Sequence, residues 1–280
     1  MQSQATVRMR RFEVGLFLFL AICLTATSVF GSSSRVKRSD SDRDISAIGH
    51  RKIANRRDPD QYSLDAEKRV GAQLSNNLER SVSLLRDPTT PTYVAHLAET
   101  VARNSDARFP IAVRIIDSEE VYALTLPGGY QYLTLGLLLR VGNECELAGV
   151  LARGIAHTAL RSAMNAPVYI GHDDYVRDSV QKKRDEFERQ EELNADYFGI
   201  QYLYKTGYDP GCFLTLIPKV WADNPAKEFR AFPPISERLE ALQEEISDIL
   251  PKRDGAVTNT PEFTGFREHL LKLDLPKAER

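Results

Sequence analysis

The chain has 280 residues, of which 42% are hydrophobic, and a chain of this size can bury one sizeable core. Its formal net charge is −2, so it lacks the strong positive field that favours binding to nucleic acid. We therefore expect one main folded domain and no nucleic-acid partner.

The N-terminus has the layout of a secretory signal. Basic residues precede the apolar run Val14–Leu24, and small and polar residues follow it. We expect residues 1–31 to direct export to the periplasm or cell envelope, with cleavage before Ser32. Two alternatives remain. The apolar stretch is also close to the length of an uncleaved membrane anchor, and Leu20–Cys23 resembles a lipoprotein box.

The rest of the chain divides by composition. Residues 32–62 are polar, carry mixed charge and show no sustained apolar period, which predicts a flexible linker. Helical periodicity starts after Ser63, a good N-cap, and a folded domain is expected over 63–250. Residues 251–280 form a C-terminal extension.

Within the domain, sequence patterns predict helices and short strands in alternating groups. After two helices, residues 111–116 predict a strand, and two short strands are expected around the turn Pro127–Gly129. A core helix begins near Asn143, and a long helix spans about 185–206. The segment after Ser236 predicts an ordinary helix with that serine as its N-cap.

Cys145 and Cys212 remain after signal removal. A single disulfide is one interpretation in an oxidising compartment, but two cysteines without a short spacing make neither a disulfide framework nor a metal knuckle. Two unpaired buried thiols are therefore the preferred interpretation.

Four sequence motifs carry a family resemblance. In chain order they are LPGGYQYLTLGLL, ELAGVLARGIAH, EELNADYFGIQYLYKTGYDP and PPISERLEAL. From about Leu64 to Leu271 the chain resembles the gluzincin metallopeptidases typified by the HtpX protease and the CAAX prenyl protease, especially their exported bacterial relatives. The resemblance implies a mostly helical α+β fold, with a small antiparallel sheet above two crossing helices that carry the site.

In that family the first site helix carries His-Glu-x-x-His, whose histidines bind zinc while the glutamate activates the metal-bound water. Placed on this chain, the resemblance puts Arg153 at the first histidine, Gly154 at the glutamate and His157 at the second histidine. It gives Glu192 the position of the third zinc ligand and Asp196 that of a supporting carboxylate. The metal-binding motif is therefore degenerate.

This departure removes the expected chemistry. A catalytic zinc site needs three protein ligands and an open water position, and only His157 and Glu192 are left. Arginine stays protonated and has no lone pair to donate, and Gly154 offers no base. We expect an inactive pseudopeptidase without a bound cofactor. The alternative is an active zinc metalloendopeptidase of envelope protein quality control, with its zinc site rebuilt with His172 or another group.

Two interpretations of Arg153 remain open. In the first, its fixed charge stands near the vacated zinc position and compensates Glu192 and Asp196, which would be costly to bury unpaired. In the second, Arg153 points outward to solvent from a turn that has lost its function.

The resemblance also assigns a binding surface. In the family an extended peptide lies along the strand beside the glycine turn, and such binding does not require catalysis. We therefore expect extended or unfolded polypeptide and envelope proteins as partners, and membrane association through the N-terminus. The residues assigned to polypeptide binding are Leu126, Pro127, Gly128, Gly129 and Tyr130.

Overall fold

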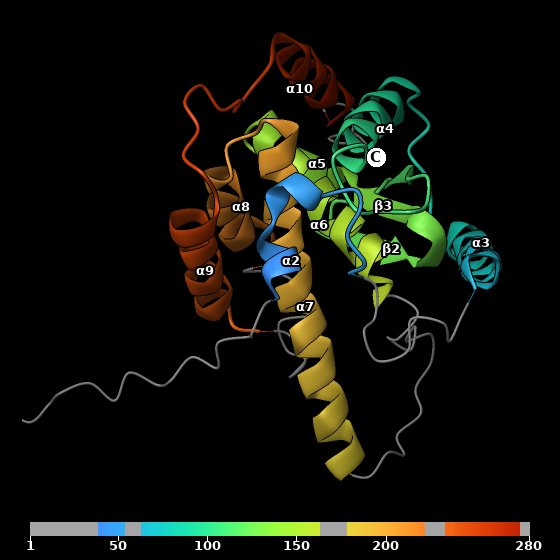
Figure 1. Cartoon of the computed structure of the whole chain (residues 1–280). Coiled ribbons are helices and arrows are strands. Elements are labelled where there is room, and N and C mark those ends of the chain that lie inside the picture. Colours follow the sequence, from blue (N-terminus) through green and yellow to red (C-terminus); the bar gives the residue numbers. More distant parts are fainter. Residues whose placement is uncertain (1–38, 54–62, 163–177, 222–232, 275–280) are drawn as a thin grey trace, which may run out of the picture. The chain divides into compact units, whose positions relative to one another are not determined.

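The computed structural model describes residues 39–53, 63–162, 178–221 and 233–274 (Figure 1). No helix in these ranges is long and apolar enough to cross a membrane, and the predicted signal at 1–31 lies outside them. The elements in chain order are α2 (Asp40–Arg43), η1 (Ile45–Ala47), α3 (Leu64–Ser81), α4 (Thr89–Ala102), β1 (Ala112–Ile116), β2 (Ala123–Leu126), η2 (Pro127–Gly129), β3 (Tyr130–Thr134), α5 (Leu135–Arg140), α6 (Glu144–Leu160), α7 (Asp178–Thr206), α8 (Gly211–Trp221), α9 (Ile235–Glu244), η5 (Glu245–Ile249) and α10 (Pro261–Asp274). The fold is α+β and mostly helical, as predicted.

The small sheet is mixed, whereas the family resemblance implied an antiparallel one. Strand β3 lies in the middle, parallel to β1 and antiparallel to β2. The predicted hairpin of β2 and β3 around Pro127–Gly129 is present. Strand β2, however, does not pair with β1, because β3 lies between them in the sheet and runs parallel to β1. Strand β2 is therefore at an edge of the sheet.

Helices α6 and α7 pack against each other and form the centre of the fold (Figure 1). Helix α6 begins where predicted, because the Asn143 side chain accepts a hydrogen bond from the Glu146 backbone N–H at 2.8 Å. Its fully buried apolar side chains include Leu147, Leu151 and Ile155. A Cβ atom on Gly199 of α7 would lie 3.1 Å from the Arg153 Cα of α6. Glycine therefore permits the close crossing of the two helices at Arg153.

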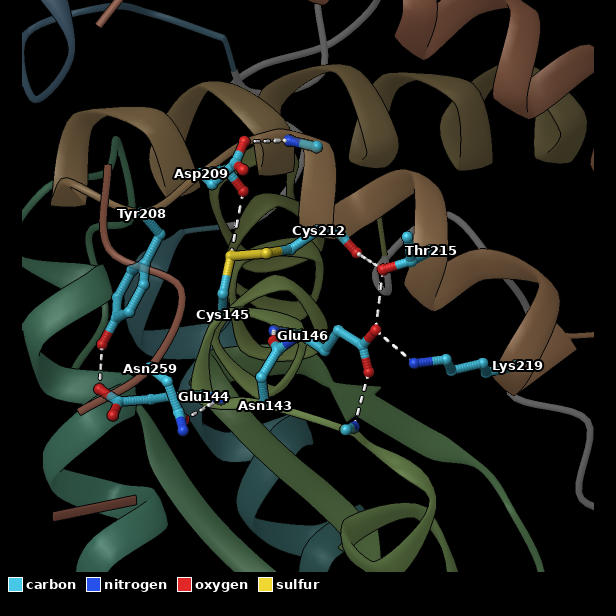
Figure 2. Close-up of a disulfide and its surroundings, with 12 residues drawn as sticks. Asn143, Glu144, Cys145, Glu146, Tyr208, Asp209, Cys212, Thr215, Lys219 and Asn259 are labelled. Atoms are coloured by element: carbon cyan, nitrogen blue, oxygen red, sulfur yellow. Dashed lines mark hydrogen bonds and ion pairs between the residues drawn. A yellow bond between two sulfur atoms is a disulfide. The ribbon is translucent and has the colours of Figure 1, made fainter. Parts of the chain in front are cut away.

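A disulfide joins the first turns of α6 and α8, so the prediction of two unpaired thiols is wrong. Cys145 and Cys212 are bonded, with their Cα atoms 5.9 Å apart (Figure 2), a separation that suits a disulfide. Polar side chains join the same two helices, because Glu146 accepts hydrogen bonds from Thr215 Oγ1 at 2.8 Å and Lys219 Nζ at 2.5 Å (Figure 2). The closed loop contains most of α6 and all of α7.

Part of the expected linker packs into the folded unit. Ile48 and Ile53 are buried in the main hydrophobic core, and the buried Arg51 places its Nη2 2.7 Å from Asp106 Oδ2. These contacts join residues far apart in the sequence, so they leave no local apolar period. The sequence pattern therefore predicted a flexible linker. The structure therefore differs from that expectation over residues 40–53.

The expected C-terminal extension also contributes to the core. Its helix α10 buries Phe263, Phe266 and Leu270. The Phe266 ring stacks on Tyr93 of α4, with ring centroids 4.2 Å apart. The C-terminal helix is thus docked on α4.

Candidate functional site

Arg153 points into the protein toward α7. Its Nε donates a hydrogen bond to Asp196 Oδ1 at 2.9 Å, and its Nη2 pairs with Glu192 Oε2. Only 12% of the Arg153 side chain is exposed, which contradicts the solvent-facing interpretation. Burial by itself would lower the pKa of Arg153, but the two carboxylates outweigh burial and raise it. The structure therefore places a fixed positive charge between both carboxylates, as the first interpretation predicted.

Asp196 has a second arginine partner that the sequence analysis missed. Arg238 donates from Nε to Asp196 Oδ2 at 2.6 Å and from Nη2 to Oδ1 at 2.8 Å. Burial raises the pKa of Asp196, but the two arginines outweigh burial and lower it. Helix α9 begins at Ile235, so Ser236 lies inside the helix and is not its N-cap. The sequence did contain a sign of this contact. Arg238 lies one turn before Leu242, on the buried face of α9.

His157 completes the cluster. Its Nε2 lies 3.8 Å from Glu192 Oε1, and burial lowers the pKa of His157 to about 4. The imidazole is therefore neutral at neutral pH, which leaves the arginines and carboxylates as the charged groups. The positive charges of Arg153 and Arg238 balance the negative charges of Glu192 and Asp196. Among the described residues, the formal charges of these four side chains therefore cancel.

The donor set at this position does not fit a catalytic zinc ion. His157 and Glu192 supply two of the three ligands that such a site requires, and the guanidinium of Arg153 already pairs with Glu192. A zinc ion beside it would face a positive group that stays protonated. In the part of the chain that the structure describes, no group of three or more His, Cys, Asp or Glu residues could hold a metal. His172 lies outside the described residues, so its role in a rebuilt site stays a prediction.

The residues assigned to polypeptide binding are partly covered by α3. Leu126, Pro127 and Gly129 are buried, and Gly128 and Tyr130 are half-buried. Helix α3 lies very close to the turn, since a Cβ atom on Gly71 would be 2.0 Å from the Pro127 carbonyl oxygen. The exposed part of this region is the edge strand, where 36% of Leu124 is accessible to solvent. A binding role for the turn stays a prediction.

Two stretches, residues 88–170 and 178–246, match the model of peptidase family M48. The chain belongs to peptidase family M48. The matched stretches contain Arg153, Gly154 and His157 on α6 and the two carboxylates on α7. The family is therefore established, whereas the interpretation of these residues as a degenerate zinc motif stays a prediction. The narrower resemblance to exported HtpX-like forms stays a prediction.

Several M48 relatives are β-barrel assembly-enhancing proteases. The protein of Escherichia coli O157:H7 is 25% identical over 185 residues, which cover 56% of this chain and 38% of that protein. A putative β-barrel assembly-enhancing protease of Vibrio cholerae serotype O1 is 27% identical over 175 residues, which cover 52% of this chain and 36% of that protein. The protein of Yersinia pestis is 24% identical over 189 residues, which cover 56% of this chain and 38% of that protein. The match thus spans well under half the length of these relatives.

Proposed function

We propose that this M48 protein is an exported pseudopeptidase that binds extended or unfolded polypeptide in the cell envelope without hydrolysing it. The observation that carries the proposal is the pairing of Arg153 with both Glu192 and Asp196. The guanidinium stands in the place of a zinc ligand and neutralises the carboxylate that would bind the metal. Gly154 has no side chain that could accept a proton from water.

Strand β2 supplies the proposed binding surface. Ala123 and Leu124 are exposed, and among the described residues β2 pairs with β3 alone. The free N–H and C=O groups of an edge strand can pair with an added extended segment. Binding of this kind needs no metal, so it is compatible with the loss of zinc chemistry.

Three observations support export and envelope partners. Disulfides such as Cys145–Cys212 persist in oxidising compartments and are rare in the cytosol. Residues 1–31 have the layout of a secretory signal. The M48 relatives are named for β-barrel assembly. We therefore propose envelope proteins as partners, with membrane association through the N-terminus.

A second candidate function is zinc-dependent proteolysis. It is favoured by the retained pair of His157 and Glu192, whose side chains lie 3.8 Å apart, and by relatives that are named as proteases. This function requires that Glu192 leave Arg153 and that another group, such as His172, join the metal. It also requires a general base in place of Gly154.

Zinc analysis separates the two functions. Protein produced from the full-length gene would be dialysed and its zinc content measured by elemental mass spectrometry, alongside cleavage of reduced, carboxymethylated lactalbumin. The pseudopeptidase should retain far less than stoichiometric zinc and leave the polypeptide intact. Stoichiometric zinc together with cleavage would overturn the proposal, and His172→Ala should then release the metal.

Polypeptide binding is tested with the same unfolded lactalbumin, labelled with a fluorophore. Leu124→Lys places a charge on the edge strand and should weaken binding more than about fivefold, because charged edge residues oppose strand addition. Leu271→Lys is the matched control, since Leu271 is 49% exposed on α10. Equal binding by both variants would exclude the β2 edge as the binding surface.

A further inference from the structure

Gln131 of β3 fills the space that a side chain at position 154 would need. A Cβ atom on Gly154 would lie 2.9 Å from both Cδ and Nε2 of Gln131, and 3.0 Å from Thr125 Oγ1 on β2. Only 2% of Gln131 is exposed, so its amide is enclosed between the sheet and α6. The position of the missing glutamate is therefore occupied by another side chain.

The enclosed amide is poorly satisfied. In the described part of the chain, Nε2 of Gln131 has no hydrogen-bond partner, and a buried donor without a partner destabilises the folded state. What Gln131 does contribute is volume against the backbone of α6. Among the described residues, the Nε2 end of Gln131 thus fills space at this position without making a hydrogen bond.

Gly154 and Gln131 are sterically matched. Glycine in the middle of a helix is less favourable than alanine, yet even a methyl group at this position requires the Gln131 amide to shift. A glutamate adds further atoms beyond this Cβ, so the enclosed Gln131 amide would have to move farther than it would for a methyl group. Gly154 on α6 faces Gln131 on the sheet. The size of the side chain at one position therefore limits the size of the side chain that fits at the other.

We infer that Gln131 is a third block to zinc chemistry, in addition to Arg153 and Gly154. This inference rests on the proposed loss of zinc binding and deepens it. His157 and Glu192 remain as two ligands of a latent zinc site. A glutamate at position 154 would not itself bind the metal, but its overlap with Gln131 would displace α6, the helix that carries both histidine positions. Restoring the two altered motif positions therefore does not align the ligands while Gln131 keeps its full length.

The test compares two variants made from the full-length gene. Arg153→His/Gly154→Glu restores the motif, and the second variant adds Gln131→Ala. We expect the triple variant to retain near-stoichiometric zinc after dialysis and to melt at a higher temperature when zinc is added. The double variant should bind zinc at least about tenfold more weakly. Neither readout depends on peptide hydrolysis.

A matched control adds Gln73→Ala, at an exposed position of α3, to the double variant and should behave like the double variant. Zinc binding that is equally tight in the double and triple variants would overturn the role of Gln131 and leave the proposed function intact. Stoichiometric zinc in the wild-type protein would instead overturn the proposed function.

A second measurement covers the case in which the triple variant does not fold. Gly154→Ala is made in the wild type and in Gln131→Ala, and the melting temperatures of all four proteins are compared. The substitution should be better tolerated when Gln131 is shortened, because the methyl group then meets no amide. Identical shifts in the two backgrounds would overturn the steric coupling.

Discussion

Replacing Arg153 with alanine removes the cation that pairs with Glu192 and one of the two that pair with Asp196. Asp196 keeps Arg238, whereas Glu192, with 18% of its side chain exposed, is left beside the neutral His157. Removing one partner of a buried ion pair costs about 3–5 kcal/mol. Because Glu192 is partly exposed, we expect about 3 kcal/mol, which corresponds to a melting temperature lowered by about 6–12 °C.

The assay is urea denaturation followed by circular dichroism, with a surface arginine as the control. Arg103 pairs with Glu99 on α4, and their side chains are 59% and 66% exposed. Arg103→Ala should therefore change the free energy of unfolding by less than about 0.5 kcal/mol. The difference between the two variants measures the burial of the Arg153 cluster.

A double substitution tests the physical reason. Arg153→Ala/Glu192→Gln removes the unpaired charge together with its partner, so it should recover part of the stability lost in Arg153→Ala. The reasoning is refuted if Arg153→Ala loses no more stability than Arg103→Ala. It is also refuted if Glu192→Gln only adds a further loss.

Two more predictions follow from the disulfide and from Asp87. The bonded cysteines are 67 residues apart. Cys145→Ser/Cys212→Ser should therefore lower the free energy of unfolding by about 4 kcal/mol, because the unfolded chain gains the entropy of an open loop. A loss below about 1 kcal/mol in urea denaturation would contradict this mechanism. Burial by itself would raise the pKa of Asp87, but hydrogen bonds from Thr90, together with the neighbouring His269, whose Nε2 lies 3.0 Å from Asp87 Oδ2, outweigh burial and lower the pKa to about 2. Because the folded state binds this proton more weakly than the unfolded state, the contribution is present above about pH 4 and is lost as pH falls toward 2. Asp87→Asn should therefore cost on the order of 1 kcal/mol at pH 7, after allowance for solvent screening, and less at pH 3; a constant difference across this range would disprove the linkage.

The central helices could be predicted because their signals are local. Asn143 and the apolar residues that follow it lie in one continuous stretch, and the four-residue spacing of Glu192 and Asp196 fixes their common face. Gly199 lies on the same stripe, where the structure places it against the Arg153 backbone. The candidate site on α6 and α7 was therefore accessible from the sequence.

Other features depend on contacts between distant residues and could not be read from local patterns. The Cys145–Cys212 pairing requires the first turns of α6 and α8 to meet, and the parallel pairing of β1 depends on the path of the chain past β3. Gln131 alternates with Tyr130 and Tyr132, a pattern that suggests one covered and one exposed face. In the structure Gln131 and Tyr132 are both buried, because α3 and α6 pack on the sheet.

The disulfide also determines what a backbone cut would do. Cleavage between α6 and α7 would leave Arg153 on one fragment and Glu192 and Asp196 on the other. Since Cys145 belongs to the first fragment and Cys212 to the second, the fragments would migrate as one band on a gel without reductant and as two bands with it. A nicked chain would keep both halves of the ion-pair cluster together, so proteolytic damage at this point need not release either half.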